Sequence, residues 1–278
     1  MGLADVKEKA LTGLFWLSAL MIVGVLVLII GYIIVNGISA IDLKFILEPP
    51  SRAGKEGGIS TTIVGTLYLT VVSLLLSVPV GVASAVYLEE YANPNSRFAY
   101  LVNLTAETMA GIPSIIFGLF GFVFFVIFLN MGWSVISGSL TLAIMILPTI
   151  MRTSQEAIKA VAPELRENSL ALGASKWQTV QRIVLPSAVP GITTGIILSI
   201  GRAIGETAAL ILTAGSSLGM PINLSDPARS MAVHLYVLAM EGISMERAFG
   251  TACLLIVLIV ILNFLANWSM RRLSRAAG

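Results

Sequence analysis

Six runs of mostly apolar residues constrain this chain more than any other feature of its sequence. They are Leu11–Val35, Thr62–Leu88, Tyr100–Phe128, Trp133–Met151, Pro190–Leu212 and Phe249–Trp268. Each is long enough to cross a bilayer, which takes about 20 apolar residues in a helix. Charged residues make up 12% of the chain, whereas a soluble domain carries roughly 25%. The sequence therefore predicts an all-α, polytopic membrane protein with six transmembrane helices.

The distribution of basic residues predicts how these spans are oriented. The first run follows Lys7 and Lys9 but is longer than the 7–15 apolar residues of a signal peptide, so we expect a retained span. An even number of spans places both termini on one side. With that side inside, the inner segments hold eleven lysine and arginine residues and the outer segments five. Because inner loops are enriched in such residues, both termini are expected in the cytoplasm, in a bacterial plasma membrane.

The predicted organisation has three parts. Residues 1–61 form the first span and an external loop, 62–268 form the core, and 269–278 form a basic cytoplasmic tail. Within the core, residues 152–189 form the largest cytoplasmic segment, and residues 213–248 form a second external connection.

Composition excludes several classes of function. The net charge is +2, and no basic stripe points to nucleic acid. Cys253 is the single cysteine, so no intrachain disulfide and no cysteine metal site is expected. The single histidine, His234, lies in a predicted polar connection, and no residue near it in sequence suggests a catalytic triad, so an ordinary loop or packing role is expected. The sequence contains no phosphate-binding P-loop motif. We therefore expect no catalytic residue, metal or cofactor in this chain.

The cytoplasmic segment 152–189 has more local structure than a connector requires. Pro163 is suited to the first position of a helix, and Gly173 to the left-handed residue after its end. Ser175 and Gln178 then form a capping-box pattern that begins a second helix, expected to end before Pro186. Two short helices joined at a glycine would either pack on their own bundle or dock a partner.

Two charged residues lie inside the fifth apolar run. Arg202 is one residue past its centre, about 15 Å from either end, and cannot reach water. An arginine at that depth costs roughly 2.5–3.5 kcal/mol, so it should face the bundle interior or a polar cavity. Glu206 follows four residues later, within pairing reach on one helix face. Either the pair only neutralises itself, or Arg202 offers its donors to an anionic substrate while Glu206 orients it. We favour the second interpretation.

Small residues and a third charged residue in an apolar run accompany them. Gly191 with Gly195, and Gly201 with Gly205, form two patches where another helix can approach closely. Glu107 lies in the third run, where Pro113 is expected to kink or break the helix. Two interpretations of Glu107 stay open, a place on the substrate path or a place near the cytoplasmic headgroups.

The spacing in the cytoplasmic segment resembles the "EAA" loop of ABC importer permeases. Glu167 is followed six residues later by Gly173, and then by Ile183-x-Leu185-Pro186. The family usually has two alanines where this chain has Asn168-Ser169, which is a mild departure. The resemblance implies that the helix before the glycine inserts into a groove of an ATP-binding subunit. Glu167, Ala171, Leu172 and Gly173 are the residues that it assigns to this coupling.

Four stretches together resemble one branch of that family. They are Gly111–Gly121, Met151–Ala157, Ala171–Trp177 and Gly201–Thr207. All four are similar to the A-type permease subunit of phosphate-specific (Pst) ABC transporters, and the match runs from the second span to the sixth. The C-type sister subunit shares the last stretch, whereas Met151–Ala157 and the short amino terminus favour the A-type.

The resemblance implies a type I ABC importer permease fold with a cytoplasmic coupling helix. It implies a heterodimer with a C-type permease subunit, two ATP-binding subunits that hold ATP and Mg²⁺, and an external phosphate-binding protein. The substrate pathway would include Arg202, Glu206 and Glu107. One alternative is a permease for molybdate, tungstate or sulfate. A second is an ATP-independent secondary transporter or channel, which would not need the docking loop, and a third is a membrane subunit that transports nothing.

Overall fold

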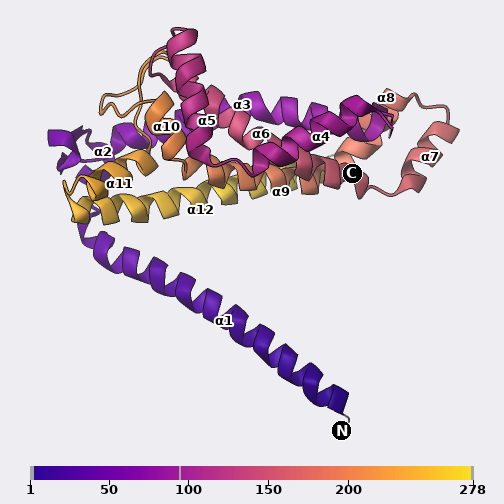
Figure 1. The fold of residues 1–278 in the computed structure, drawn as a ribbon, viewed down its shortest axis with the longest axis horizontal. Coiled ribbons are helices and arrows are strands. Elements are labelled where there is room, and N and C mark those ends of the chain that lie inside the picture. The colour runs from indigo at the N-terminus through magenta and orange to yellow at the C-terminus, as the bar shows by residue number, and fades with distance from the viewer. Residues whose placement is uncertain (1–2, 94, 277–278) are drawn as a thin grey trace.

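The computed structural model describes residues 3–93 and 95–276, and Figure 1 shows that almost every element is a helix. The long helices are α1 (Leu3–Gly37), α3 (Ser60–Val86), α4 (Arg97–Ala110), α6 (Val135–Lys159), α9 (Leu185–Ile204) and α12 (Met245–Ala276). The shorter ones are α2 (Leu43–Leu47), α5 (Ser114–Gly121), α7 (Pro163–Ala171), α8 (Lys176–Thr179), α10 (Ala208–Thr213) and α11 (Met231–Met240). Three π-helical turns extend them: η3 (Tyr87–Tyr91), η4 (Phe122–Phe128) and η5 (Val180–Val184).

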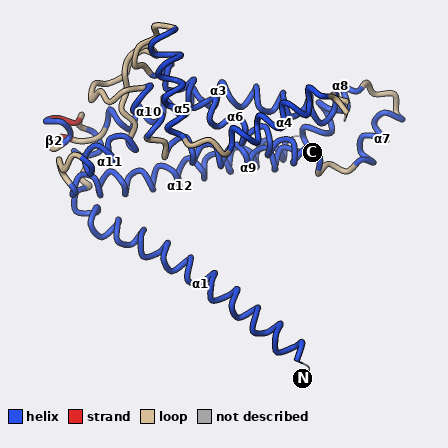
Figure 2. Tube along the Cα trace, in the orientation of Figure 1, coloured by secondary structure: helices blue, strands red, loops and turns tan. Residues whose placement is uncertain are grey.

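The connection between α1 and α3 has its own small structure. It contains two 3₁₀ turns, η1 (Ile38–Ala40) and η2 (Arg52–Gly54). On either side of η2, β1 (Pro50–Ser51) pairs antiparallel with β2 (Glu56–Gly57), with Pro50 opposite Gly57. Figure 2 shows this hairpin at one end of the molecule, beside α11.

Five helices of the described chain are long and apolar enough to cross a membrane, and the bent pair α4–α5 makes a sixth span if it is counted as one. The two halves of that pair meet at 106°. The predicted break at Pro113 is therefore confirmed. Proline has no N–H to continue the helix and disfavours a helical residue before it, so α4 ends at Ala110 and a new helix begins at Ser114.

Several predicted boundaries are wrong. The helix that starts at Lys176 does not end before Pro186 but continues through η5 into α9, as one helical segment from Lys176 to Ile204. In η5 the Leu185 N–H bonds to the Val180 carbonyl, which shifts the hydrogen-bond register by one residue. The shift falls where Pro186 has no N–H to donate, so the wider turn accommodates the proline.

The fifth span is also displaced from its predicted limits of Pro190 and Leu212. α9 ends at Ile204, Gly205 follows it, and a separate short helix α10 begins at Ala208. The fourth span extends further than predicted, because α6 runs to Lys159 rather than to Met151. The part of 152–189 that lies outside these long helices is therefore limited to α7 and its flanking residues.

The helices α3, α6 and α9 form the centre of the bundle. Leu142, Ile146 and Ile150 of α6 are fully buried in the main hydrophobic cluster. Glycines permit the close approach of the helices. A methyl group on Gly81 of α3 would lie 2.8 Å from Ile150 Cγ2, and one on Gly195 of α9 would lie 2.7 Å from Thr153 Cβ of α6. The prediction that a helix approaches Gly191 and Gly195 is confirmed, since Gly191 lies against Ala157 of α6.

The helix α1 stands apart from this bundle. Figure 1 shows it diverging from the other helices along most of its length. It meets α12 near its end, where Tyr32 packs edge-on against Phe249 at 5.6 Å and the Cys253 thiol donates to the Ile33 carbonyl at 3.3 Å. The start of α1, the end of α12 and α7 lie toward the same end of the long axis, opposite to α2 and α11.

Candidate functional site

Arg202 is half-buried and lies in the last turn of α9, so its predicted position near the centre of a span is wrong. Within the described part of the chain, no hydrogen bond or ion pair reaches its guanidinium group. Gly201 beside it has no atom within 4 Å of the position a Cβ would take, and Gly205 meets only the backbone oxygen of Gly201. Unlike Gly191 and Gly195, this second glycine pair is not covered by a helix of this chain. Arg202 therefore has all five of its donors unpaired within the described part of the chain, next to this uncovered glycine pair.

Glu206 is not the partner of Arg202, and the predicted pair is wrong. Because α9 ends at Ile204, the two residues do not share a helix face four positions apart. Glu206 is buried, and its Oε1 accepts hydrogen bonds from the Ala209 N–H at 3.0 Å and the Thr207 N–H at 3.2 Å. A carboxylate stabilises the amino-terminal end of a helix in this way, so Glu206 caps α10.

Glu107 pairs with a residue that the sequence analysis did not select. Its Oε2 accepts from Arg152 Nη2 of α6 at 3.1 Å, and the Glu107 side chain is 73% exposed. The pair joins α4 to α6 on an accessible surface, where an ion pair contributes at most about 1 kcal/mol. No ion pair or hydrogen bond between described residues connects Glu107 with Arg202. A place for Glu107 on the substrate path stays a prediction.

The helix α7 and the turn after it have the predicted local structure. Pro163 is in the first turn of α7, and Gly173 has φ of +85°, which an L-residue with a side chain rarely adopts. The capping box of α8 is complete: the Gln178 N–H donates to Ser175 Oγ at 3.3 Å, and the Ser175 N–H donates to Gln178 Oε1 at 2.8 Å. Sequence pattern suffices here because each of these interactions is local.

The residues assigned to coupling are all on the surface. Glu167, Ala171 and Gly173 are exposed, and Leu172 is 89% exposed. Leu165, Leu170 and Trp177 nearby are also exposed apolar side chains. An apolar cluster that the chain leaves uncovered at the tip of a loop is typical of a contact surface for another protein.

The sequence analysis did not predict three clusters of buried and partly buried polar residues. Two of them lie at the end of the molecule where α7 is found. Arg166 of α7 donates to Glu90 at 2.9 Å. Gln155 of α6 donates to both Glu89 and Asn103 at 3.0 Å. These partners are 52 to 76 residues apart in sequence. No periodicity or short motif could have paired them.

The third cluster lies beside the hairpin of the first connection. Arg229 directs Nε and Nη2 to the Ser216 carbonyl at 3.0 and 2.7 Å, and its Nη1 is 3.4 Å from His234 Nδ1. Burial, and secondly the charge of Arg229, lower the pKa of His234 to about 4. His234 therefore stays neutral near pH 7. Its predicted place in a polar connection is wrong, since it lies in α11, and its full burial there agrees with the packing role.

A bundle of five to six apolar helices with an exposed two-helix projection defines a polytopic membrane permease. Residues 77–277 match the family described as binding-protein-dependent transport system inner membrane component, and the chain belongs to this family. It is a permease subunit of the ABC importer class, with the type I importer fold.

Several known proteins are similar to this chain over most of its length. The chain is 35% identical over 279 residues to a probable ABC transporter permease protein, YqgI, of Bacillus subtilis, covering 95% of each chain. It is 31% identical to the phosphate transport system permease protein PstA of Pasteurella multocida, covering 92% of this chain and 88% of that protein. It is 35% identical to PstA 1 of Mycobacterium tuberculosis over 76% of this chain and 69% of the other.

Solved structures agree on the fold. A bacterial ABC transporter that imports the acidic polysaccharide alginate contains a similar chain, with a TM-score of 0.66 and 17% identity, covering 97% of this chain and 98% of that one. The MetNI methionine ABC transporter contains another, with a TM-score of 0.57 and 20% identity over 80% and 94% of the two chains. These likenesses concern the fold and not the substrate.

Proposed function

We propose that this chain is half of the translocation pathway of an ATP-driven phosphate importer. The observation that carries the proposal is Arg202, a half-buried guanidinium with no partner among the described residues, placed on an open stretch of α9. A guanidinium binds a tetrahedral oxyanion through two parallel hydrogen bonds. The similarity to several phosphate transport permeases supports phosphate rather than molybdate, tungstate or sulfate as the anion.

The proposal assigns a protein partner to each of three surfaces of the chain. The open face around Gly201 and Gly205 would meet a C-type permease subunit, which completes the pathway as a heterodimer. The exposed surface of α7, with Glu167, Ala171 and Leu172, would dock on one of two ATP-binding subunits that hold ATP and Mg²⁺. An external phosphate-binding protein would dock at the opposite end, beside α2 and α11. In this arrangement both termini and α7 face the cytoplasm.

The test is uptake of labelled phosphate by the whole complex in vesicles containing ATP. Arg202→Ala should reduce uptake by at least about tenfold, because a difference of 1.4 kcal/mol in binding already gives that factor. Arg202→Lys should also be strongly impaired, since lysine offers a point charge in place of a planar fork. Arg97→Ala, which removes an exposed arginine of α4 with no ion pair among the described residues, is the matched control.

Two further measurements separate the alternatives. Excess molybdate, tungstate or sulfate should not compete with phosphate, and strong competition would indicate another oxyanion. Removal of ATP with the proton gradient intact should stop uptake, whereas a secondary transporter would continue. Uptake at wild-type level by Arg202→Ala, at equal amounts in the membrane, would contradict the site assignment.

A further inference from the structure

The π-helical turn η3 at the end of α3 lies where α7, α8 and α6 converge. Its sequence, Tyr87-Leu88-Glu89-Glu90-Tyr91, places two acidic residues side by side. The turn is closed by the Ala92 N–H, which donates to the Tyr87 carbonyl five residues earlier at 2.8 Å. Such wide turns interrupt an α-helix at some cost and are frequent at functional sites. η3 is therefore a candidate functional element of the permease.

The strongest connection to η3 comes from Arg166 of α7. Arg166 Nε donates to Glu90 Oε1 at 2.9 Å, and the Glu90 and Arg166 side chains are only 9% and 23% exposed. Arg166 Nη1 donates to the Val161 carbonyl at 2.6 Å, and Nη2 donates to the Ile158 carbonyl in the last turn of α6 at 2.7 Å. One guanidinium thus bonds α7 to the ends of both α3 and α6. Its planar, fixed donors hold these three elements in one geometry.

Two other residues hold the same turn. The ammonium group of Lys176, at the start of α8, lies 5.1 Å from the centre of the Tyr91 ring. Lys159, at the end of α6, lies 3.7 Å from Glu89, which also accepts from Gln155. Arg166, which precedes the exposed turn at Gly173, and Lys176, which follows it, therefore both contact η3.

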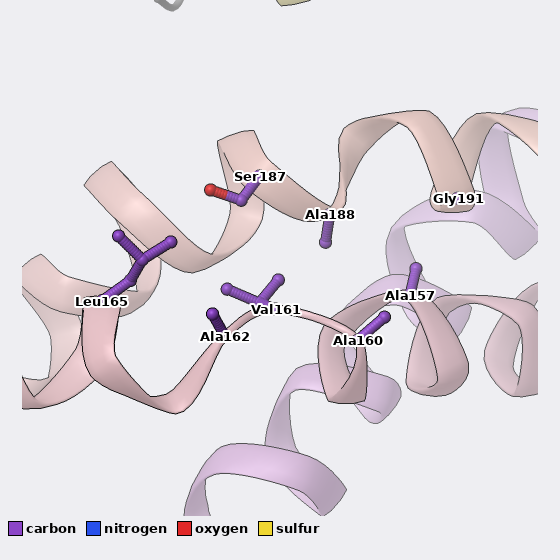
Figure 3. A pocket seen from close by; sticks show the side chains of 8 residues that line it. All are labelled: Ala157, Ala160, Val161, Ala162, Leu165, Ser187, Ala188 and Gly191. Atoms are coloured by element: carbon purple, nitrogen blue, oxygen red, sulfur yellow. The ribbon is translucent and has the colours of Figure 1, made fainter.

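The contact of α7 with α9 differs from its contact with η3, because a pocket rather than an ion pair lies between the two helices. The pocket has a volume of about 340 Å³ and lies at the base of α7. Figure 3 shows the side chains that line it, most of which are small. Leu165 lies on one side of it, and Ser187, Ala188 and Gly191 of α9 lie on the other. Ser169 bonds Thr179 at 2.9 Å, which links α7 to α8 and so along the chain to α9. The ion pair with Glu90 is the link that reaches α3, 76 residues away in sequence.

The other end of α3 is attached just as firmly. α3 and η3 together span 32 residues, Ser60 to Tyr91, or about 48 Å at 1.5 Å per residue. Near its start, Thr66 Oγ1 accepts from the Met231 N–H at 2.8 Å. A methyl group on Gly65 would lie 2.8 Å from the Arg229 carbonyl oxygen, so the backbones touch there. Arg229 in turn holds the Ser216 carbonyl in the connection between α10 and α11.

We infer that Glu90 is a positioning residue for energy coupling, which transmits displacement of α7 through Arg166 to α3. α3, which is helical throughout despite Pro79 in its interior, then connects the surface that docks the ATPase with the connection held by Arg229. The inference rests on the proposed function in one respect, namely that α7 docks on an ATP-hydrolysing subunit. It adds the path by which that docking reaches the opposite end of the protein.

The experiment measures two rates on the same purified complex in proteoliposomes with the loaded binding protein. These are ATP hydrolysis and uptake of labelled inorganic phosphate. Glu90→Gln removes the charge and keeps the shape. We expect the ATPase subunit to remain bound and to hydrolyse ATP, while phosphate transported per ATP falls about fivefold or more. Glu90→Asp keeps a carboxylate and should recover part of the ratio. Glu8→Gln, which removes an exposed acid from α1, is the matched control and should keep the wild-type ratio.

Each other outcome is decisive. An unchanged ratio of phosphate to ATP in Glu90→Gln would overturn the inference, because the link would then carry no coupling. Loss of membrane insertion or of the ATPase subunit would also overturn it, since the pair would then hold the fold only. If the wild type imports another oxyanion and no phosphate, the proposed substrate fails. The same ratio is then measured with that anion, and the role of Glu90 is still tested.

Discussion

Replacement of Gly195 by alanine should loosen the bundle, and replacement of Gly201 should not. A helix gains roughly 0.8–1 kcal/mol when glycine becomes alanine. At Gly195 the new methyl group would lie 2.7 Å from Thr153 Cβ, and Thr153 is held by hydrogen bonds to the Thr149 and Ile150 carbonyls. Overpacking of this kind costs about 1–3 kcal/mol, so Gly195→Ala should lose up to about 2 kcal/mol net. At Gly201 nothing lies within 4 Å of the new group, and Gly201→Ala should gain up to about 1 kcal/mol.

The assay is thermal unfolding of the purified chain in detergent, with both variants and the wild type measured together. We expect the order Gly201→Ala, wild type, Gly195→Ala, from most to least stable. Thr153→Ala in the Gly195→Ala background removes the hydroxyl and methyl groups of Thr153 and should recover part of the loss. Equal stability of the two single variants would refute the argument, because it would mean that α9 does not pack on α6 at Gly195.

Two further predictions concern orientation and pH. In a chain whose Cys253 is replaced, Leu172→Cys should react with an impermeant thiol reagent only after cells are opened, and Lys55→Cys should react in intact cells; the opposite pattern would reverse the proposed orientation. Because the pKa of His234 falls to about 4 from an unfolded value of 6.5, its neutral form favours the fold. It contributes up to about 3 kcal/mol above pH 6.5, and this is lost as the pH falls toward 4. The thermal stability of His234→Asn should depend less on pH across that window, and an unchanged pH dependence would count against it.

The membrane spans were predictable because a helix surrounded by lipid must consist mostly of apolar residues. A helix in a bilayer needs a long apolar run whatever it packs against, so five long helices and the α4–α5 pair fall on the predicted runs. The boundaries were not predictable in the same way. α6 continues eight residues past the predicted end at Met151, to Lys159, because polar residues remain helical where Arg152 and Gln155 find partners on α4 and η3.

The candidate site also contains one residue that the sequence indicated and one whose contacts it did not predict. Sequence alone indicated Arg202, since an arginine in an apolar run is costly wherever it points. The predicted pairing of Glu206 with Arg202 was wrong, because four residues of spacing imply a shared face only if the helix continues, and α9 ends at Ile204. The carboxylate bonds to the start of α10 instead. A place for Glu206 on the substrate path stays a prediction.

What the sequence by itself determined is therefore local: the apolar runs, the break at Pro113, the glycine turn at Gly173 and the capping box at Ser175. Each depends on residues within a few positions of one another. Tertiary structure decided which charged groups are paired. Glu90 with Arg166 and Glu107 with Arg152 each join separate elements. Their partners are chosen by how the helices pack, and helix packing depends on side chains from the whole chain at once.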